Sequence, residues 1–144
     1  MAFWVHGETP GTPREIGLLF RSLVELGEVI ADLNASHDLP WPLAFGAGIN
    51  SGVAVTGNMG SAALSDHTAM GDAVNNAFRL ESASKEIGIE VVVGRATYEL
   101  LELSDDVAGL FSAHSVELKG YDEPERVQAL RAGALETVAR ALEA

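Results

Sequence analysis

The sequence contains no cysteine, few basic residues and no long apolar run. Without cysteine there is neither a disulfide framework nor a thiolate metal site. Only 9 Lys and Arg residues accompany 21 Asp and Glu residues, and the formal charge of −12 excludes a nucleic-acid binder, which needs a basic surface to neutralise phosphates. No apolar stretch approaches the roughly 18–20 residues that a membrane-spanning helix requires.

The remaining composition is typical of one globular domain. The 144 residues are 47% hydrophobic and 21% charged, which indicates a chain that buries a core. No linker or repeat divides it. The first residues carry no basic region followed by an apolar one, so no signal peptide is predicted. The expected location is the cytoplasm, or the cytoplasmic part of a larger protein.

The pattern of apolar residues and turn signals predicts a mixture of helices and strands. Thr12, Pro13 and Glu15 form a helix-start signature, and the apolar residues that follow recur at threes and fours as far as Leu33. The other predicted elements are a strand at 2–5, a hairpin of 44–49 and 53–56 around a turn at 50–52, a loop at 57–60, a helix at 72–87 stopped by Gly88, a strand at 89–93, a helix at 96–103, strands at 116–118 and 126–130 around a turn at 120–122, and a terminal helix at 135–142. Together they predict an α+β sandwich with helices packed against one sheet.

Asn75 and Arg79 are the leading candidates for a functional pair. They lie four residues apart in the predicted helix 72–87, so both point to one helix face. A guanidinium and an amide aimed at one point suit the charge that develops on a phosphoryl group during its transfer. The alternatives are a solvated helix face, with Arg79 paired to Asp72 or Glu86 and Asn75 serving as a helix-start residue.

Several motifs follow one another in an order that resembles the catalytic domain of class III adenylate and guanylate cyclases, in its bacterial type. The motifs are Gly48-Ile-Asn-Ser-Gly52, Val55-Thr-Gly-Asn-Met-Gly60, His67-Thr-Ala-Met-Gly-Asp-Ala-Val-Asn-Asn-Ala-Phe-Arg-Leu-Glu81, Val116-Glu-Leu-Lys-Gly120 and Glu123-Pro-Glu-Arg-Val127. The resemblance covers residues 1–131 and implies a ferredoxin-like nucleotide cyclase sandwich. Residues 132–144 are expected to form a short helical tail.

The resemblance also implies a role for four residues. Asn75 occupies the position of the asparagine that orients the ribose, and Arg79 that of the arginine that stabilises the pentavalent phosphorus. Lys119 matches a lysine that contacts the triphosphate, although a lysine before a glycine turn is commonplace. Thr68 lies where related enzymes read the purine, which favours ATP over GTP, although a β-branched strand residue would also be ordinary there.

The sequence departs from the family at its metal site. The family holds two divalent metals, usually Mg²⁺ or Mn²⁺, between two cyclase domains. Its two metal-binding aspartates and a purine-selecting lysine would precede Met1, so we expect no metal ligand in this chain. The expected fold is therefore a truncated one, without the first strand, the helices that follow it and the second strand. His6, His37, His67 and His114 have no metal-ligand spacing.

Two functions remain open at this point. The first is a fragment of an adenylate cyclase whose full-length parent converts ATP into 3′,5′-cyclic AMP and pyrophosphate, with very low activity expected of the isolated chain. The second is a non-catalytic cyclase-homology module that dimerises with, or complements, a partner cyclase domain. In both, a homodimer or a partner domain is expected.

Overall fold

The computed structural model describes residues 7, 9–61, 64–117 and 123–144. Its helices and strands follow the order α1 (Pro13–Ser36), β1 (Ala47–Ile49), β2 (Val55–Ser61), β3 (Leu64–Met70), α2 (Asp72–Ile87), β4 (Val91–Gly94), α3 (Arg95–Glu99), α4 (Asp105–Ala108), β5 (Ser112–Val116), β6 (Glu125–Leu130), the 3₁₀ helix η1 (Ala132–Ala134) and α5 (Leu135–Glu143). The strand predicted at 2–5 and the turn predicted at 120–122 lie outside the described residues. The order is that of a mixed α and β fold, as predicted.

Helix α1 begins where the sequence predicts it. The Thr12 hydroxyl accepts a hydrogen bond from the backbone N–H of Glu15, and the Glu15 carboxylate accepts one of 2.9 Å from the backbone N–H of Thr12. This reciprocal pair satisfies two N–H groups that have no partner inside the helix. Ile16 and Phe20, in the next turns, enter the core. The predicted long helix is confirmed.

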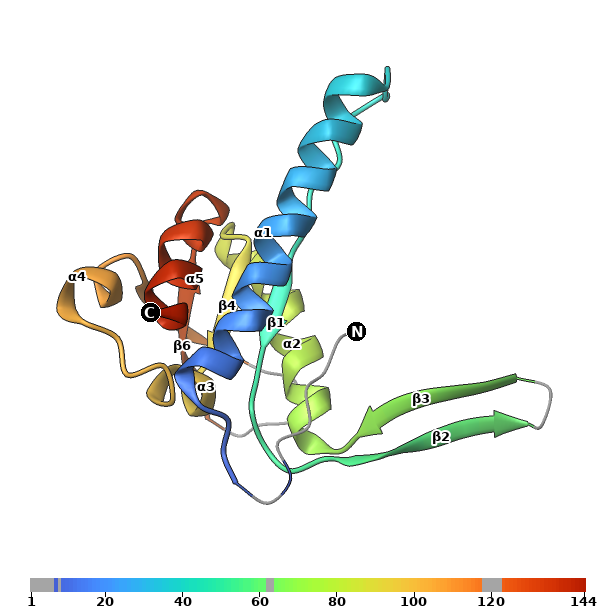
Figure 1. The fold of residues 1–144 in the computed structure, drawn as a ribbon, viewed down its shortest axis with the longest axis vertical. Helices are drawn as coiled ribbons and strands as arrows, with labels where there is room; N and C mark the ends of the chain where they lie inside the picture. Colours follow the sequence, from blue (N-terminus) through green and yellow to red (C-terminus); the bar gives the residue numbers. More distant parts are fainter. Residues whose placement is uncertain (1–6, 8, 62–63, 118–122) are drawn as a thin grey trace.

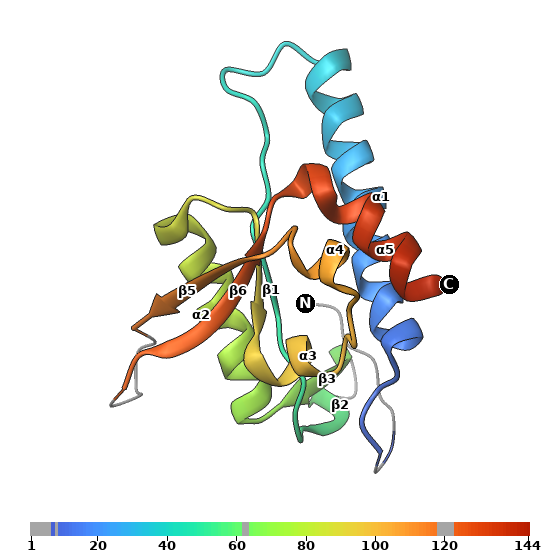
Figure 2. The same cartoon turned by 90° about the vertical axis from the view of Figure 1, so that its left-hand side faces the viewer.

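A four-stranded sheet forms the centre of the fold, in the order β1-β4-β6-β5. Strands β1 and β4 run parallel, while β6 is antiparallel to both β4 and β5. All four residues of β4 are buried, because helices cover both faces of the sheet (Figure 2). Val91 and Val93 belong to the core that includes residues of α1 and α5, whereas Val92 packs with the cluster that includes Leu80 of α2.

The hairpin predicted for residues 44–56 is wrong. β1 pairs with β4 from much later in the chain, and the hairpin instead joins β2 to β3, with Val55 opposite Met70. The predicted loop at 57–60 belongs to β2. Residues 50–52 do not close a turn, since the Asn50 side chain is held by the carbonyl of Ala73 in α2. In this region, pairing between distant strands therefore outweighs the local sequence preference for a turn.

The second helix and the last one match the prediction, and the third does not. Gly88 ends α2 with a left-handed backbone at φ 74°, a conformation in which glycine has no Cβ clash. The helix predicted at 96–103 is too long: α3 ends at Glu99, Glu102 has a φ of 49°, and α4 is a separate helix that starts at Asp105, beyond the predicted range. Helix α5 packs on α1, and its Val138 and Ala139 are fully buried. None of the described helices has the length and apolar character needed to cross a membrane.

An ion-pair network joins α1 to α5. Arg21 of α1 donates to Glu136 at 2.6 Å and to Glu143 at 3.0 Å, both on α5. The hydrogen bond from Arg21 holds the pKa of the Glu143 carboxyl below its ordinary value of 4.5. A carboxyl with a lowered folded-state pKa stabilises the fold fully above its unfolded pKa, and this contribution disappears as the pH falls through the folded pKa.

We therefore expect Arg21→Met to lower the melting temperature near neutral pH, with a difference from the parent that shrinks as the pH falls below 4.5. Thermal melts followed by circular dichroism from about pH 7 to about pH 3 measure this difference. Arg95→Gln is the control, because among the described residues Arg95 forms its ion pair with Glu99, one turn away on the same helix. A difference that stays constant over this pH range would contradict the assignment.

Candidate functional site

The site begins where the β2–β3 hairpin joins helix α2. A single residue, Gly71, separates Met70 at the end of β3 from Asp72 at the start of α2. Gly71 has a φ of 139°, and a Cβ at this position would approach the carbonyl oxygen of Val53 to 3.3 Å. The backbone conformation favours glycine, and the space for a side chain is tight. The chain thus passes directly from an extended ribbon into a helix whose first turn faces the joint (Figure 1).

Asn75 and Arg79 lie on neighbouring turns of α2, as predicted. Asn75 is exposed and Arg79 is half-buried, while Asn76 and Leu80 beside them are buried. Each residue of an α-helix is rotated by about 100° around the axis from the one before. Asn75 and Arg79 therefore lie on the same side of α2, next to its buried face. The helix thus packs by one side and presents an amide and a guanidinium at the border of that packed side.

The other two predicted residues have different outcomes. Thr68 is half-buried in β3 opposite Gly57, four residues before the first residue of α2. β3 runs straight into α2, so Thr68 and Asn75 lie on either side of the same joint. Lys119 lies outside the described residues, so the structure says nothing about its position.

Contacts with β1 hold α2 against the sheet. A Cβ on Gly48 would collide with the carbonyl oxygen of Ala77 and the backbone nitrogen of Glu81, so glycine allows helix and strand to touch. Beyond β1, the Asn50 amide donates a hydrogen bond of 3.0 Å to the carbonyl of Ala73, in the first turn of α2. Asn50 therefore positions the helix that carries Asn75.

Asn50 lies in one of the sequence motifs, but the motif did not predict its role. Asn76 was not predicted either, and its buried Oδ1 has no hydrogen-bond partner within the part of the chain that the structure describes. Buried acceptors are rarely left unpaired. Both residues depend on tertiary contacts, so only the neighbouring glycines and the doubled asparagine signalled them in advance.

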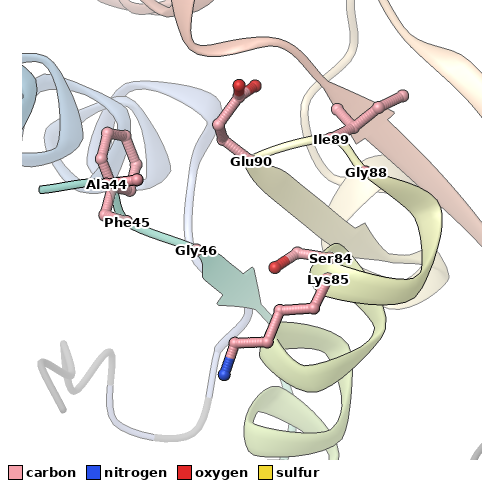
Figure 3. A pocket seen from close by; sticks show the side chains of 8 residues that line it. All are labelled: Ala44, Phe45, Gly46, Ser84, Lys85, Gly88, Ile89 and Glu90. Atoms are coloured by element: carbon pink, nitrogen blue, oxygen red, sulfur yellow. The ribbon is translucent and has the colours of Figure 1, made fainter. Parts of the chain in front are cut away.

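The described residues also contain a groove at the opposite end of α2. It has a volume of about 250 Å³ and lies between the segment 44–46 and the end of the helix, where Ser84, Lys85 and Gly88 line it (Figure 3). Lys85 forms an ion pair of 3.1 Å with Glu81. Of the predicted site residues that the structure describes, Thr68, Asn75 and Arg79, none lines this groove. It therefore plays no part in the candidate site.

Metal ligands are a separate question. Across residues 7, 9–61, 64–117 and 123–144, no three Asp, Glu or His side chains gather where they could hold a metal ion. Two-metal chemistry on a triphosphate needs convergent oxygen ligands. The donors within these ranges therefore do not fit a divalent metal pair.

Two curated proteins are similar in sequence to this chain. An adenylate cyclase of Anabaena cylindrica is 30% identical over 90 residues, which is 62% of this chain and 18% of that protein. The terminal-differentiation specific adenylate cyclase of Dictyostelium discoideum is 36% identical over 78 residues, which is 54% of this chain and 4% of that protein. The chain thus spans less than a fifth of either relative. It matches no protein-family model.

Solved structures show the same fold. A bacterial light-regulated adenylyl cyclase superposes with a TM-score of 0.63 at 20% identity, over 92% of this chain and 40% of the other. The adenylyl cyclase CyaB from P. aeruginosa superposes with a TM-score of 0.59 at 21% identity, over 86% of this chain and 62% of the other. The chain therefore has the adenylyl cyclase fold, and the α+β class is confirmed.

Proposed function

We propose that this chain supplies half of a class III nucleotide cyclase site, the half that orients the ribose and stabilises the reacting phosphorus. The observation that carries the proposal is the placement of Asn75 and Arg79 on adjacent turns of α2, directly after β3, in a chain with the adenylyl cyclase fold. The proposed cyclase portion comprises residues 1–131. Helix α5, within 132–144, supports it by packing on α1.

In the proposed reaction, the ribose 3′-oxygen of ATP attacks the α-phosphorus. A new bond forms between the 3′-oxygen and the α-phosphorus, and the bond from the α-phosphorus to the oxygen that bridges to the β-phosphate breaks. Pyrophosphate leaves with that electron pair, and the proton of the 3′-hydroxyl passes to water. The Asn75 amide hydrogen-bonds the ribose and keeps the 3′-oxygen in line. The Arg79 guanidinium donates to the phosphoryl oxygens, whose negative charge increases in the transition state.

Thr68 and Lys119 complete the substrate contacts in this proposal. The Thr68 hydroxyl exchanges one hydrogen bond with the purine edge, and the Lys119 ammonium contacts the triphosphate, with ATP favoured over GTP. The cytoplasm, which holds ATP, is the proposed location. Two divalent cations, Mg²⁺ or Mn²⁺, are part of such chemistry. Because the described donors do not fit them, their ligands would come from another polypeptide segment.

A partner domain is part of the same proposal. The β2–β3 ribbon stands away from the body of the molecule (Figure 1) and exposes Val55, Met59 and Met70. A two-stranded ribbon is at best marginally stable in water when nothing covers it. Either a second copy or a complementary cyclase domain would bury these side chains and close the site.

A second candidate function is a non-catalytic module that dimerises with, or complements, a partner cyclase domain. The lack of a metal-ligand cluster in the described ranges favours it over autonomous catalysis. The two functions make the same contacts with the partner. They differ in whether a parent chain supplies the carboxylates itself.

The test mixes the chain with a cyclase domain that keeps its metal-binding carboxylates but lacks the asparagine and the arginine. With Mn²⁺ and ATP we expect cyclic AMP from the mixture and none from either chain alone. Size-exclusion chromatography of the mixture reports association separately from chemistry. Two chains that coelute and still form no cyclic AMP would contradict the catalytic proposal and leave a module that only dimerises.

A further inference from the structure

Helix α1 carries an apolar stripe that nothing in the described molecule covers. Leu18, Leu26, Val29 and Leu33 are between 38% and 55% exposed. Their spacings of eight, three and four residues place them on one side of the helix, over about 22 Å of its length. Four large apolar side chains in one row on a helix are typical of a helix-binding surface.

The position of α1 explains why the stripe is uncovered. Only Ile16, Gly17 and Phe20, near the start of the helix, are buried. The C-terminal half extends beyond the sheet and the other helices in both views (Figures 1 and 2). The segment that follows α1 packs against a different side of the helix. The Asn34 side chain hydrogen-bonds both the backbone N–H and the carbonyl of Leu43, and Gly27 lies next to the ring of Phe45.

The charges beside the stripe select its partner. From residue 22 to residue 78 the sequence contains six Asp and Glu residues and no Lys or Arg. Glu25, Glu28 and Asp32 line one border of the stripe, are exposed, and form no ion pair with any described residue. The last turn of α1 has no basic side chain, so the negative end of the helix dipole adds to the same field.

We propose that this surface, the α1 stripe with its acidic border, binds a basic amphipathic helix of a partner protein. Apolar side chains of that helix would cover Leu26, Val29 and Leu33, and its Lys or Arg residues would pair with Glu25, Glu28 and Asp32. A second copy of α1 would bring acidic borders together, which is repulsive. Nucleic acid and anionic lipid are excluded by the same sign of charge.

The test uses two synthetic peptides of about 18 residues, with the same leucine stripe and either lysine or glutamate on its borders. Fluorescence anisotropy with the full chain should give a Kd on the order of 10 µM for the lysine peptide and weakening as salt is raised. The combined variant Leu26→Gln, Val29→Gln and Leu33→Gln should weaken binding by at least about tenfold. Val53→Gln, on an exposed residue outside α1, is the control.

A charge-reversed chain with Glu25→Lys, Glu28→Lys and Asp32→Lys should prefer the glutamate peptide. All six positions are exposed, so circular dichroism should show an unchanged fold. The proposal is overturned if the parent binds both peptides equally, or binds neither up to about 1 mM. It is also overturned if the parent is a dimer that the glutamine variant dissociates, because a second copy would then occupy the surface. Since binding alone is read out, the outcome is independent of cyclase activity.

Discussion

Arg79→Ala is expected to reduce cyclic AMP formation in the complementation mixture by about 10²–10³-fold. The loss corresponds to roughly 2.7–4 kcal/mol of transition-state stabilisation for one well-placed donor. The half-buried position of Arg79 on α2 supports a strong contact, because partial removal from water strengthens its attraction to phosphate. The measurement is the initial rate with Mn²⁺ and ATP, as kcat and KM separately. A transition-state role predicts a fall mainly in kcat.

Arg140→Ala is the matched control for this prediction. Arg140 is an exposed arginine whose partner is Glu136 on α5, away from the candidate site, so the rate should stay within about twofold of the parent. Arg79→Lys keeps a positive charge but loses the bidentate hydrogen-bond donor, so the rate of cyclic AMP formation should remain far below that of the parent. An Arg79→Ala mixture that retains the parental rate would remove Arg79 from the proposed chemistry.

Gly48→Ala is expected to produce the largest change in stability. The added methyl group would meet the backbone of α2 at Ala77, Leu80 and Glu81, with the Leu80 carbonyl carbon only 2.9 Å away. Backbone atoms cannot rotate aside as the end of a flexible side chain can, so the helix must move off β1. We expect a loss of about 3 kcal/mol, at the upper end of overpacking effects. A drop in melting temperature of roughly 10 °C would correspond to it.

Gly133→Ala is the control, because nothing lies within 4 Å of a Cβ at that position. Its melting temperature should match or slightly exceed that of the parent, since alanine restricts the unfolded chain. Differential scanning calorimetry measures both variants. Similar melting temperatures for the two alanine variants would show that α2 has room to move at Gly48.

Local signals predicted the elements whose structure depends on nearby residues. The capping pair of Thr12 and Glu15 and the left-handed Gly88 both act within a few residues, so the starts and stops of α1 and α2 follow from the sequence. The same holds for Asn75 and Arg79, whose common face needs only the helical repeat. Their proposed roles came from the resemblance and are still predictions.

Contacts between distant segments could not be predicted in this way. β1 pairs with β4 across more than 40 residues, and the parallel pairing leaves no local turn signal. The Asn50 hydrogen bond to Ala73 likewise depends on where α2 packs. The break at Glu102 has a positive φ at a residue type that gives no warning of it. The errors in strand pairing arose where tertiary structure overrode local preference.

The single glycine between ribbon and helix has a consequence for how such a site would be controlled. A protein that binds β3 also fixes the position of the first turn of α2, because only Gly71 separates the two elements. Binding of the partner and alignment of the reactive groups would then occur together. With one residue as the connection, a partner could not bind the ribbon and leave the helix in another position. On the proposed function, output would rise and fall with the concentration of assembled pairs, and dilution alone would switch it off.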